Sequence, residues 1–272
     1  MTHEISQSYI PQNNLTDKNL ERKRVNMSVA GLFKNDSTKS ERQTECLFGE
    51  ELLILEYGET MSLSKLLKDN YVGYVETKAL CTPTTKQTHI VSVPRTFLYL
   101  QADLRGPAEM ALSMGSKVSV VDETEVRNTM YSILDDGKSI VSCHLKPIEH
   151  VFEDYVSVAQ TFLHTPYFWG GISGFGIDCS GFVQTSMLMA GRIVARDTAA
   201  QKNTIGTPLT ESDSLQRGDL IFWEGHVAIM FDDKNIIHAN GHSMNVAIEP
   251  LEEAITRIAK MHEYPVARRR PI

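Results

Sequence analysis

The sequence contains no apolar stretch that approaches the ~20 residues needed to span a bilayer, and it has no excess of basic residues. Its 27 lysines and arginines are outnumbered by 34 aspartates and glutamates, which gives a net charge of −7. A nucleic-acid or anionic-membrane binder needs a basic face, so neither partner is predicted. The short run Arg268–Arg270 is predicted to be a solvated tail.

Cysteine is scarce: Cys46, Cys81, Cys143 and Cys179 are far apart, and no C-x-x-C pair occurs. This spacing predicts neither a disulfide scaffold nor a zinc or redox motif, and no cofactor is expected. Three of the four are expected to be small buried apolar residues. Only Cys179 lies in a context that suggests chemistry.

A secretory signal is also lacking. The N-terminal segment MTHEISQSYIPQNNLTDKNLERKR is polar and has no apolar core before a small-residue cleavage site. We therefore expect a cytoplasmic protein, and we expect residues 1–22 to form a flexible arm.

Short β-like runs dominate the first half of the chain. Glycines and polar turns separate the runs of residues 23–82, which predicts a small barrel, and residues 83–147 repeat the pattern. The sequence then changes to helical spacing, a Gly-rich loop, a second helix and three strands. Residues 148–272 are therefore predicted to be an α+β domain with helices packed on an antiparallel sheet.

Cys179 lies where the Gly-rich loop YFWGGISGFGID becomes a helix that Gly191 can end. A thiol there meets unpaired backbone N–H groups and the positive end of the helix dipole. Both favour the thiolate, which is the reactive form, and Asp178 can cap the helix. The alternative is an inert buried cysteine at a helix end.

Two histidines favour the reactive interpretation. His226 opens one predicted strand and His238 lies on the next, with a polar turn between them. Side chains alternate along strands, so a connection with an odd residue count places both on one face as diagonal neighbours. An even count separates them. In the odd case His238 can orient His226 while His226 takes the Cys179 proton.

Two other interpretations stay open at this point. The same cysteine and histidines are acceptable zinc ligands, and spacing alone does not exclude a metal site. His242 competes for the third position, but it follows Gly241 in a predicted turn and ranks below His238.

Taken together, the segments of residues 150–265 resemble the NlpC family of papain-like cysteine peptidases in order and spacing. The matching stretches are Tyr167-Phe168-Trp169-Gly170-Gly171, Asp178-Cys179-Ser180-Gly181-Phe182, Arg196-Asp197-Thr198 with Gln201, Arg217-Gly218-Asp219-Leu220-Ile221-Phe222, Gly225-His226-Val227-Ala228-Ile229 and Ile237-His238-Ala239. The resemblance implies that Cys179 is the nucleophile, His226 the base and His238 the orienting residue. It also implies that Tyr167 directs its hydroxyl toward the oxyanion, whereas Trp169 is expected to be a core aromatic.

The first β-rich segment resembles a bacterial SH3-like barrel. Its matching stretches are Ser40-Glu41-Arg42-Gln43-Thr44, Phe48-Gly49-Glu50 and Asp69-Asn70-Tyr71-Val72-Gly73-Tyr74-Val75. Glu45 stands where glutamine is usual, and Tyr74 stands where tryptophan is frequent. Residues 83–147 depart further from the pattern of a second barrel.

This arrangement resembles enzymes that recycle cell-wall peptides by cutting the γ-D-glutamyl–diamino acid bond after a free N-terminal L-alanine. A buried ammonium needs acceptors, because without them it costs several kcal/mol. The resemblance implies that the pocket residues are Asp178, Ser180, Asp197, Tyr71, Thr198 and, less directly, Glu41. The alternatives are a barrel-core role for Tyr71 and a helix-cap role for Asp197.

The leading hypothesis is therefore a cytoplasmic cysteine endopeptidase whose partner is a murein peptide. A second hypothesis is an exported hydrolase of intact peptidoglycan, with an open groove. A third is a non-catalytic protein that binds wall peptides through its barrels.

Overall fold

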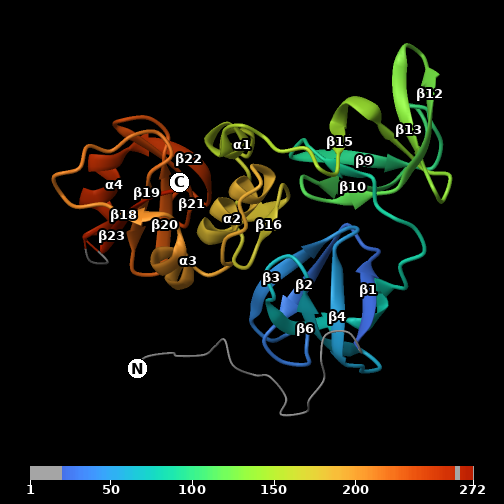
Figure 1. The fold of residues 1–272 in the computed structure, drawn as a ribbon, viewed down its shortest axis with the longest axis horizontal. Helices are drawn as coiled ribbons and strands as arrows, with labels where there is room; N and C mark the ends of the chain where they lie inside the picture. The colour runs from blue at the N-terminus through green and yellow to red at the C-terminus, as the bar shows by residue number, and fades with distance from the viewer. Residues whose placement is uncertain (1–19, 261–263, 272) are drawn as a thin grey trace.

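The computed structural model describes residues 20–260 and 264–271, and it divides into three successive units (Figure 1). Most of the predicted arm, residues 1–19, lies outside the described residues. No helix within the described ranges is long and apolar enough to cross a membrane.

The first unit is a barrel-like antiparallel sheet of seven strands in the order β3-β2-β6-β5-β4-β1-β7. The strands are β1 (Glu21–Val25), β2 (Val29–Phe33), β3 (Arg42–Leu47), β4 (Glu51–Glu56), β5 (Met61–Leu66), β6 (Val72–Glu76) and β7 (Leu80–Cys81), with a 3₁₀ turn at Thr77–Ala79. Strand β1 begins two residues inside the segment predicted to be a flexible arm, because it pairs with β4. Alternate side chains such as Leu32, Leu52 and Val75 fill the core.

The second unit contains a five-stranded sheet in the order β10-β9-β14-β13-β12 and a three-stranded sheet in the order β11-β8-β15. Its strands are β8 (His89–Val91), β9 (Arg95–Tyr99), β10 (Ala108–Ser113), β11 (Lys117–Val118), β12 (Val120–Val126), β13 (Thr129–Leu134), β14 (Ser139–Val141) and β15 (Leu145–Pro147), with a 3₁₀ turn at Ser142–His144. Arg127 and Asn128 both have positive φ, which matches the twist of the two-residue β12–β13 hairpin.

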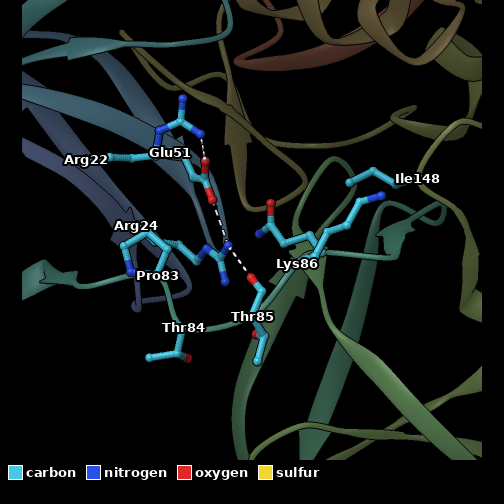
Figure 2. A pocket seen from close by; sticks show the side chains of 9 residues that line it. Arg22, Arg24, Glu51, Pro83, Thr84, Thr85, Lys86 and Ile148 are labelled. Carbon is cyan, nitrogen blue, oxygen red and sulfur yellow. Dashed lines mark hydrogen bonds and ion pairs between the residues drawn. The ribbon is translucent and has the colours of Figure 1, made fainter. Parts of the chain in front are cut away.

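The linker between these two units is tied to the first one. Arg24 donates to Glu51 at 2.7 Å and to the backbone carbonyl of Thr85 at 2.8 Å, while Arg22 contacts the other oxygen of Glu51 at 3.2 Å. These groups line a cavity of about 410 Å³, together with Lys86 (Figure 2). None of the predicted site residues lines this cavity, so it is a seam between units.

In its described residues the third unit combines helices with an antiparallel sheet, as predicted. The sheet has six strands rather than the three expected, in the order β18-β23-β19-β20-β21-β22. Its elements are α1 (Tyr155–Thr161), β16 (Ile172–Ser173), β17 (Gly176–Ile177), α2 (Cys179–Met189), α3 (Thr198–Thr204), β18 (Thr207–Pro208), β19 (Leu220–Trp223), β20 (His226–Met230), β21 (Asn235–Asn240), β22 (Asn245–Pro250), α4 (Leu251–Ile258) and β23 (Ala267–Arg270). Gly191 lies just beyond α2 with φ +72°, which fits the predicted helix stop.

The arginine run near the C-terminus is not the solvated tail that its composition predicts. It lies in β23, between β18 and β19, and Arg270 contacts the fully buried Asp219 at 2.7 Å. The guanidinium groups of these arginines can reach solvent or a carboxylate, while their backbone pairs with the neighbouring strands.

The six-stranded sheet separates two apolar layers. Val227, Ile229 and Ile237 pack with α1 and α2, whereas Ala228 and Ile236 pack with α4. Figure 1 shows α2 and α4 on opposite sides of the sheet. By this alternation the side chains of His226 and His238 lie on the same face as Ala228 and Ile236.

Candidate active site

Cys179 is the first residue of α2, and the chain around it is tightly held. Asp178 caps the helix by accepting the Gly181 N–H at 2.7 Å, as predicted. Only 6% of Cys179 is exposed. Its Sγ lies 3.8 Å from the carbonyl oxygen of Gly225 and receives the N–H of Val227, so the sulfur lies against the backbone on both sides of His226.

The protonation of this thiol differs from the expectation based on the helix dipole. Burial, with the Asp178 carboxylate, raises the pKa of Cys179 to about 11, although the Val227 N–H and the Thr198 hydroxyl lower it. Loss of hydration therefore outweighs the helix terminus. At neutral pH the resting group is the thiol, so a base must take its proton when it reacts.

The two histidines lie on one face of the sheet. Met230 pairs with Ile236 across a five-residue connection, which is the odd case that makes His226 and His238 diagonal neighbours. Nε2 of His226 lies 2.9 Å from Nδ1 of His238, and their ring centroids are 5.1 Å apart. Two nitrogens that share a hydrogen bond cannot both ligate one ion, so the geometry argues against the zinc alternative.

No group of three or more His, Cys, Asp or Glu side chains within residues 20–260 and 264–271 is placed to hold a metal ion. His242 is exposed in the turn after β21, where its backbone N–H donates to Asn240 at 3.0 Å. His242 therefore lies in the predicted turn, beyond the end of the strand that carries His238.

Behind His238 lie two charged residues that the sequence motifs did not single out. Nε2 of His238 lies 2.7 Å from Oε1 of Glu249, and Arg257 of α4 donates to the same oxygen. Burial acts to raise the pKa of Glu249, but the hydrogen bonds from His238 and Arg257 bring it down to about 2. Their spacing from His238, 11 and 19 positions, carries no motif; only the β21–β22 register could have indicated Glu249.

The low pKa of Glu249 predicts a loss of stability in acid. The contribution of this carboxylate is present above its ordinary pKa of 4.5 and lost as the pH falls through about 2. The shift corresponds to on the order of 3 kcal/mol. Urea denaturation of the wild type and Glu249→Gln checks this: the difference in unfolding free energy should shrink between about pH 5 and pH 2. A difference that does not change with pH would contradict it.

Tyr167 packs, partly buried, against the core cluster that contains Cys179. Its backbone N–H donates to Met244 at 2.9 Å, and its backbone bridges to Ile177, just before Asp178. Burial, with Cys179 nearby, raises the pKa of its hydroxyl. The group therefore stays protonated and can donate a hydrogen bond.

Asp178 and Ser180 occupy a buried network around Arg196. Arg196 contacts the two carboxylate oxygens of Asp178 at 3.0 and 2.6 Å and the Ser180 hydroxyl at 2.8 Å. Gly170 and Gly181 also donate to Asp178, so its acceptor sites are taken. Within the chain, Asp178 and Ser180 therefore support the start of the helix that carries Cys179.

Asp197 and Tyr71 meet across the boundary between the first barrel and the third unit. Asp197 is the N-cap residue of α3, but its side chain makes no capping bond. Its Oδ1 lies 3.4 Å from the Tyr71 hydroxyl, which is also 3.4 Å from Gln43. Although Asp197 is open to solvent, the protein packed around it raises its pKa, against the influence of Arg196.

Thr198 connects this acidic group to the nucleophile. Its Oγ1 lies 3.9 Å from the Cys179 sulfur, and it directly follows Asp197 in the chain. The Tyr71 ring packs against the barrel core, as the core interpretation predicts, while its hydroxyl reaches Asp197.

Two neighbouring glutamates have contrasting places. Glu41 is exposed and pairs with Lys34 at 3.5 Å, and no contact joins it to the other predicted site residues. Glu45 is 3% exposed, and its carboxylate accepts the backbone N–H of Ile172 at 3.0 Å. The replacement of the usual glutamine by Glu45 was the only sequence signal for this contact.

Trp169 is not a core residue, and that expectation is wrong. Its side chain is 60% exposed. The positive φ of Gly170 turns the chain so that the Gly170 N–H donates inward to Asp178 at 2.8 Å. The guanidinium of Arg42 lies 4.8 Å from the centre of the Phe168 ring, and Phe168 is also exposed, so both aromatic residues of this loop face outward.

Comparison with known proteins finds a family match for the first and the third unit. Residues 164–262 match the NlpC/P60 family, and residues 32–80 match the bacterial dipeptidyl-peptidase SH3 domain. Dipeptidyl-peptidase 6 of Lysinibacillus sphaericus is 27% identical over 246 residues, which cover 83% of this chain and 90% of that protein. The γ-D-glutamyl-L-lysine dipeptidyl-peptidase of Bacillus subtilis is 29% identical over 78% of this chain and 77% of its own length.

The fold also extends over nearly the whole length of a solved relative. The crystal structure of an NlpC/P60 family protein from Bacillus cereus superposes with a TM-score of 0.76 at 21% identity, covering 92% of this chain and 99% of that one. At this identity the match shows a shared fold, including the β-rich unit that precedes residue 148.

Proposed function

We propose, from the premise that residues 164–262 are an NlpC/P60 domain, that this cysteine peptidase hydrolyses the γ-D-glutamyl–diamino acid bond of murein peptides with a free N-terminal L-alanine. The observation that carries the proposal is the meeting of two elements at one place. The Cys179 sulfur lies against the backbone beside His226 and near the Thr198 hydroxyl. Asp197 precedes Thr198 in the chain, and the Tyr71 hydroxyl of the barrel contacts the Asp197 carboxylate.

The reaction begins with the resting thiol. As the sulfur attacks the γ-carbonyl carbon of D-glutamate, the thiol proton passes to Nδ1 of His226, because its Nε2 is engaged with His238. The carbonyl oxygen gains negative charge, which the backbone N–H of Cys179 and the Tyr167 hydroxyl stabilise as donors.

Three proton transfers complete the cycle. The imidazolium of His226 returns its proton to the nitrogen of the diamino acid, and the C–N bond breaks to leave a thioester on Cys179. Water then attacks the thioester while His226 takes a proton from it, and the C–S bond breaks to release L-Ala-D-Glu. The imidazolium returns its proton to the departing sulfur, which restores the thiol. His238 keeps the His226 ring oriented through both steps.

The amine of the substrate is the basis of specificity in this proposal. The Asp197 carboxylate makes no capping hydrogen bond to α3 and can therefore accept one from the ammonium. Gln43 and Tyr71 add oxygen acceptors from the barrel. An ammonium beside Asp197 would also offset the surroundings that raise its pKa. Peptides still joined to the glycan through the alanine amine lack that charge, so a recycling role in the cytoplasm forms part of the proposal.

The proposal is tested with L-Ala-γ-D-Glu-diaminopimelate, its lysine counterpart, and the same peptides acetylated at the alanine amine. We expect release of L-Ala-D-Glu from the free-amine peptides only, followed by mass spectrometry. Equal cleavage of the acetylated peptides, or clearing of purified sacculi at a similar rate, would favour the hydrolase of intact peptidoglycan.

Asp197→Asn should weaken binding of the free amine specifically. Loss of the charge is expected to lower kcat/KM by about 10- to 100-fold, mainly through KM, because the ammonium loses a charged partner in a partly enclosed site. Steady-state kinetics check this, with Asp213→Asn as a matched control on an exposed loop. A fall in kcat at constant KM would contradict an amine-binding role.

A further inference from the structure

The hydrogen-bonded row that starts at His226 does not end at His238. It continues to Glu249 on β22 and to Arg257 on α4. We propose that Glu249 is a positioning residue that sets the tautomer of both histidines, and that Arg257 holds its carboxylate in place. This inference rests on the proposed function and adds a fourth and a fifth member to the site.

The sheet register explains why Glu249 reaches His238. His238 pairs with Ala247, and Ile236 pairs with Glu249. Positions two apart on a strand point to the same face, so Glu249 is the diagonal neighbour of His238. His226 stands in the same diagonal relation on the other side of His238, and the three side chains therefore form one row across three strands.

The proton positions along the row follow from the carboxylate. An ionised Glu249 only accepts, so Nε2 of His238 must carry a proton and donate it. Nδ1 of neutral His238 is then an acceptor, which requires the proton of neutral His226 to be on Nε2. Nδ1 of His226 consequently holds the lone pair that accepts the thiol proton.

The surroundings keep Glu249 ionised and in position. The titratable or charged groups that contact its carboxylate are His238 from β21 and Arg257 from α4, and both donate to it. The His238 side chain is fully buried, whereas the side chains of Glu249 and Arg257 are 21% and 23% exposed. A buried imidazole whose tautomer is fixed by a partly shielded ion pair cannot easily reverse its donor and acceptor.

The central test is Glu249→Gln, which keeps the shape and removes the charge. An amide can donate to Nε2 of His238 and so reverse both tautomers. We expect kcat/KM for the free-amine peptide to fall by about 10- to 100-fold. We also expect the acidic limb of the pH–rate profile to shift to lower pH by about one unit. The reason is that the variant has no carboxylate at position 249 to stabilise the imidazolium form of the histidines.

Two further variants separate positioning from folding. Glu249→Asp keeps the charge, so its acidic limb should stay with the wild type and part of the rate should return. Glu253→Gln makes the same chemical change on the exposed first turn of α4 and should leave both rate and profile unchanged. If Glu249→Gln keeps the wild-type pH profile and loses activity only in proportion to its melting temperature, the positioning role is wrong.

A measurement without peptide separates this inference from the proposed function. The rate of Cys179 alkylation by iodoacetamide, followed by peptide mass spectrometry across pH, reports on the thiol and imidazole alone. A profile that shifts in Glu249→Gln supports the inference even if no murein peptide is cleaved. Unchanged alkylation and unchanged kinetics in this variant, with an active wild type, would overturn the inference and leave the function standing.

Arg257→Met provides an independent check from the other end of the row. Without the guanidinium, the pKa of Glu249 should rise toward its ordinary value. Activity relative to wild type should then be largely kept near neutral pH and fall below about pH 5, where the carboxyl takes up a proton. A loss of the same size at every pH would show that Arg257 acts only in packing.

Discussion

Cys179→Ala is expected to abolish hydrolysis of L-Ala-γ-D-Glu-diaminopimelate, with a fall in kcat of at least about 10⁴-fold. The reason is that a thioester requires the sulfur. The Thr198 hydroxyl, 3.9 Å from that sulfur, is a far weaker nucleophile than a thiol. Binding of the peptide should be nearly unchanged, because Asp197 and Tyr71 remain.

The measurement combines product release with calorimetric binding of the intact peptide to the inactive variant. Cys143→Ser is the matched control, since Cys143 is exposed and should be dispensable. Retention of more than a few per cent of the activity in Cys179→Ala would contradict a nucleophilic thiol, and with it the proposed reaction.

Arg196→Met is expected to be the most destabilising single substitution described here. It leaves the Asp178 carboxylate buried without its cation and removes the 2.8 Å contact from Arg196 to Thr44 of the barrel. Breaking a buried pair on one side costs about 3–5 kcal/mol. The melting temperature should fall on the order of 10 °C.

Differential scanning fluorimetry checks this expectation, with Arg105→Met as a control because Arg105 is exposed. Activity of the surviving folded fraction should also fall, since Asp178 caps the helix that presents Cys179. A melting temperature within about 2 °C of the wild type would show that Asp178 tolerates the loss, for instance by taking up a proton.

The sequence predicts the third unit well because its pattern is local. The helix that begins at Cys179, the stop at Gly191 and the strands of His226 and His238 all follow from spacing and turn chemistry. The family resemblance orders these pieces. The sequence did not reveal which residues of β20 and β21 pair. Only the observed pairing of Met230 with Ile236 shows that His226 and His238 share a face.

The errors have physical causes that depend on tertiary contacts. Composition predicts a solvated tail at Arg268–Arg270. The segment instead forms strand β23, which pairs with β18 on one side and β19 on the other. A tryptophan is usually buried, yet Trp169 points outward because Arg42 and Asp178 occupy the space inside its loop. The dipole argument for Cys179 omitted burial, which is invisible in a sequence and outweighs it.

The contacts of the predicted substrate-binding residues were harder to foresee than those of the predicted catalytic residues. Asp178 and Asp197 are both acidic residues at helix starts, and the sequence gives no reason to separate them. The structure does so through Arg196, which saturates the first, while the second keeps its oxygen toward Tyr71. Long-range partners of this kind lie more than 100 positions apart and carry no periodic signal.

The barrel and the third unit share buried polar contacts, and this limits how the gene can be recombined. Arg196 reaches Thr44, and the Ile172 N–H reaches Glu45. Fusion of residues 148–272 to a foreign partner would leave the Nε–H of Arg196 and the Ile172 amide without these acceptors, although the Arg196–Asp178 pair would remain. Evolution can therefore exchange the two units only as a matched pair, or by changing both sides of the joint together.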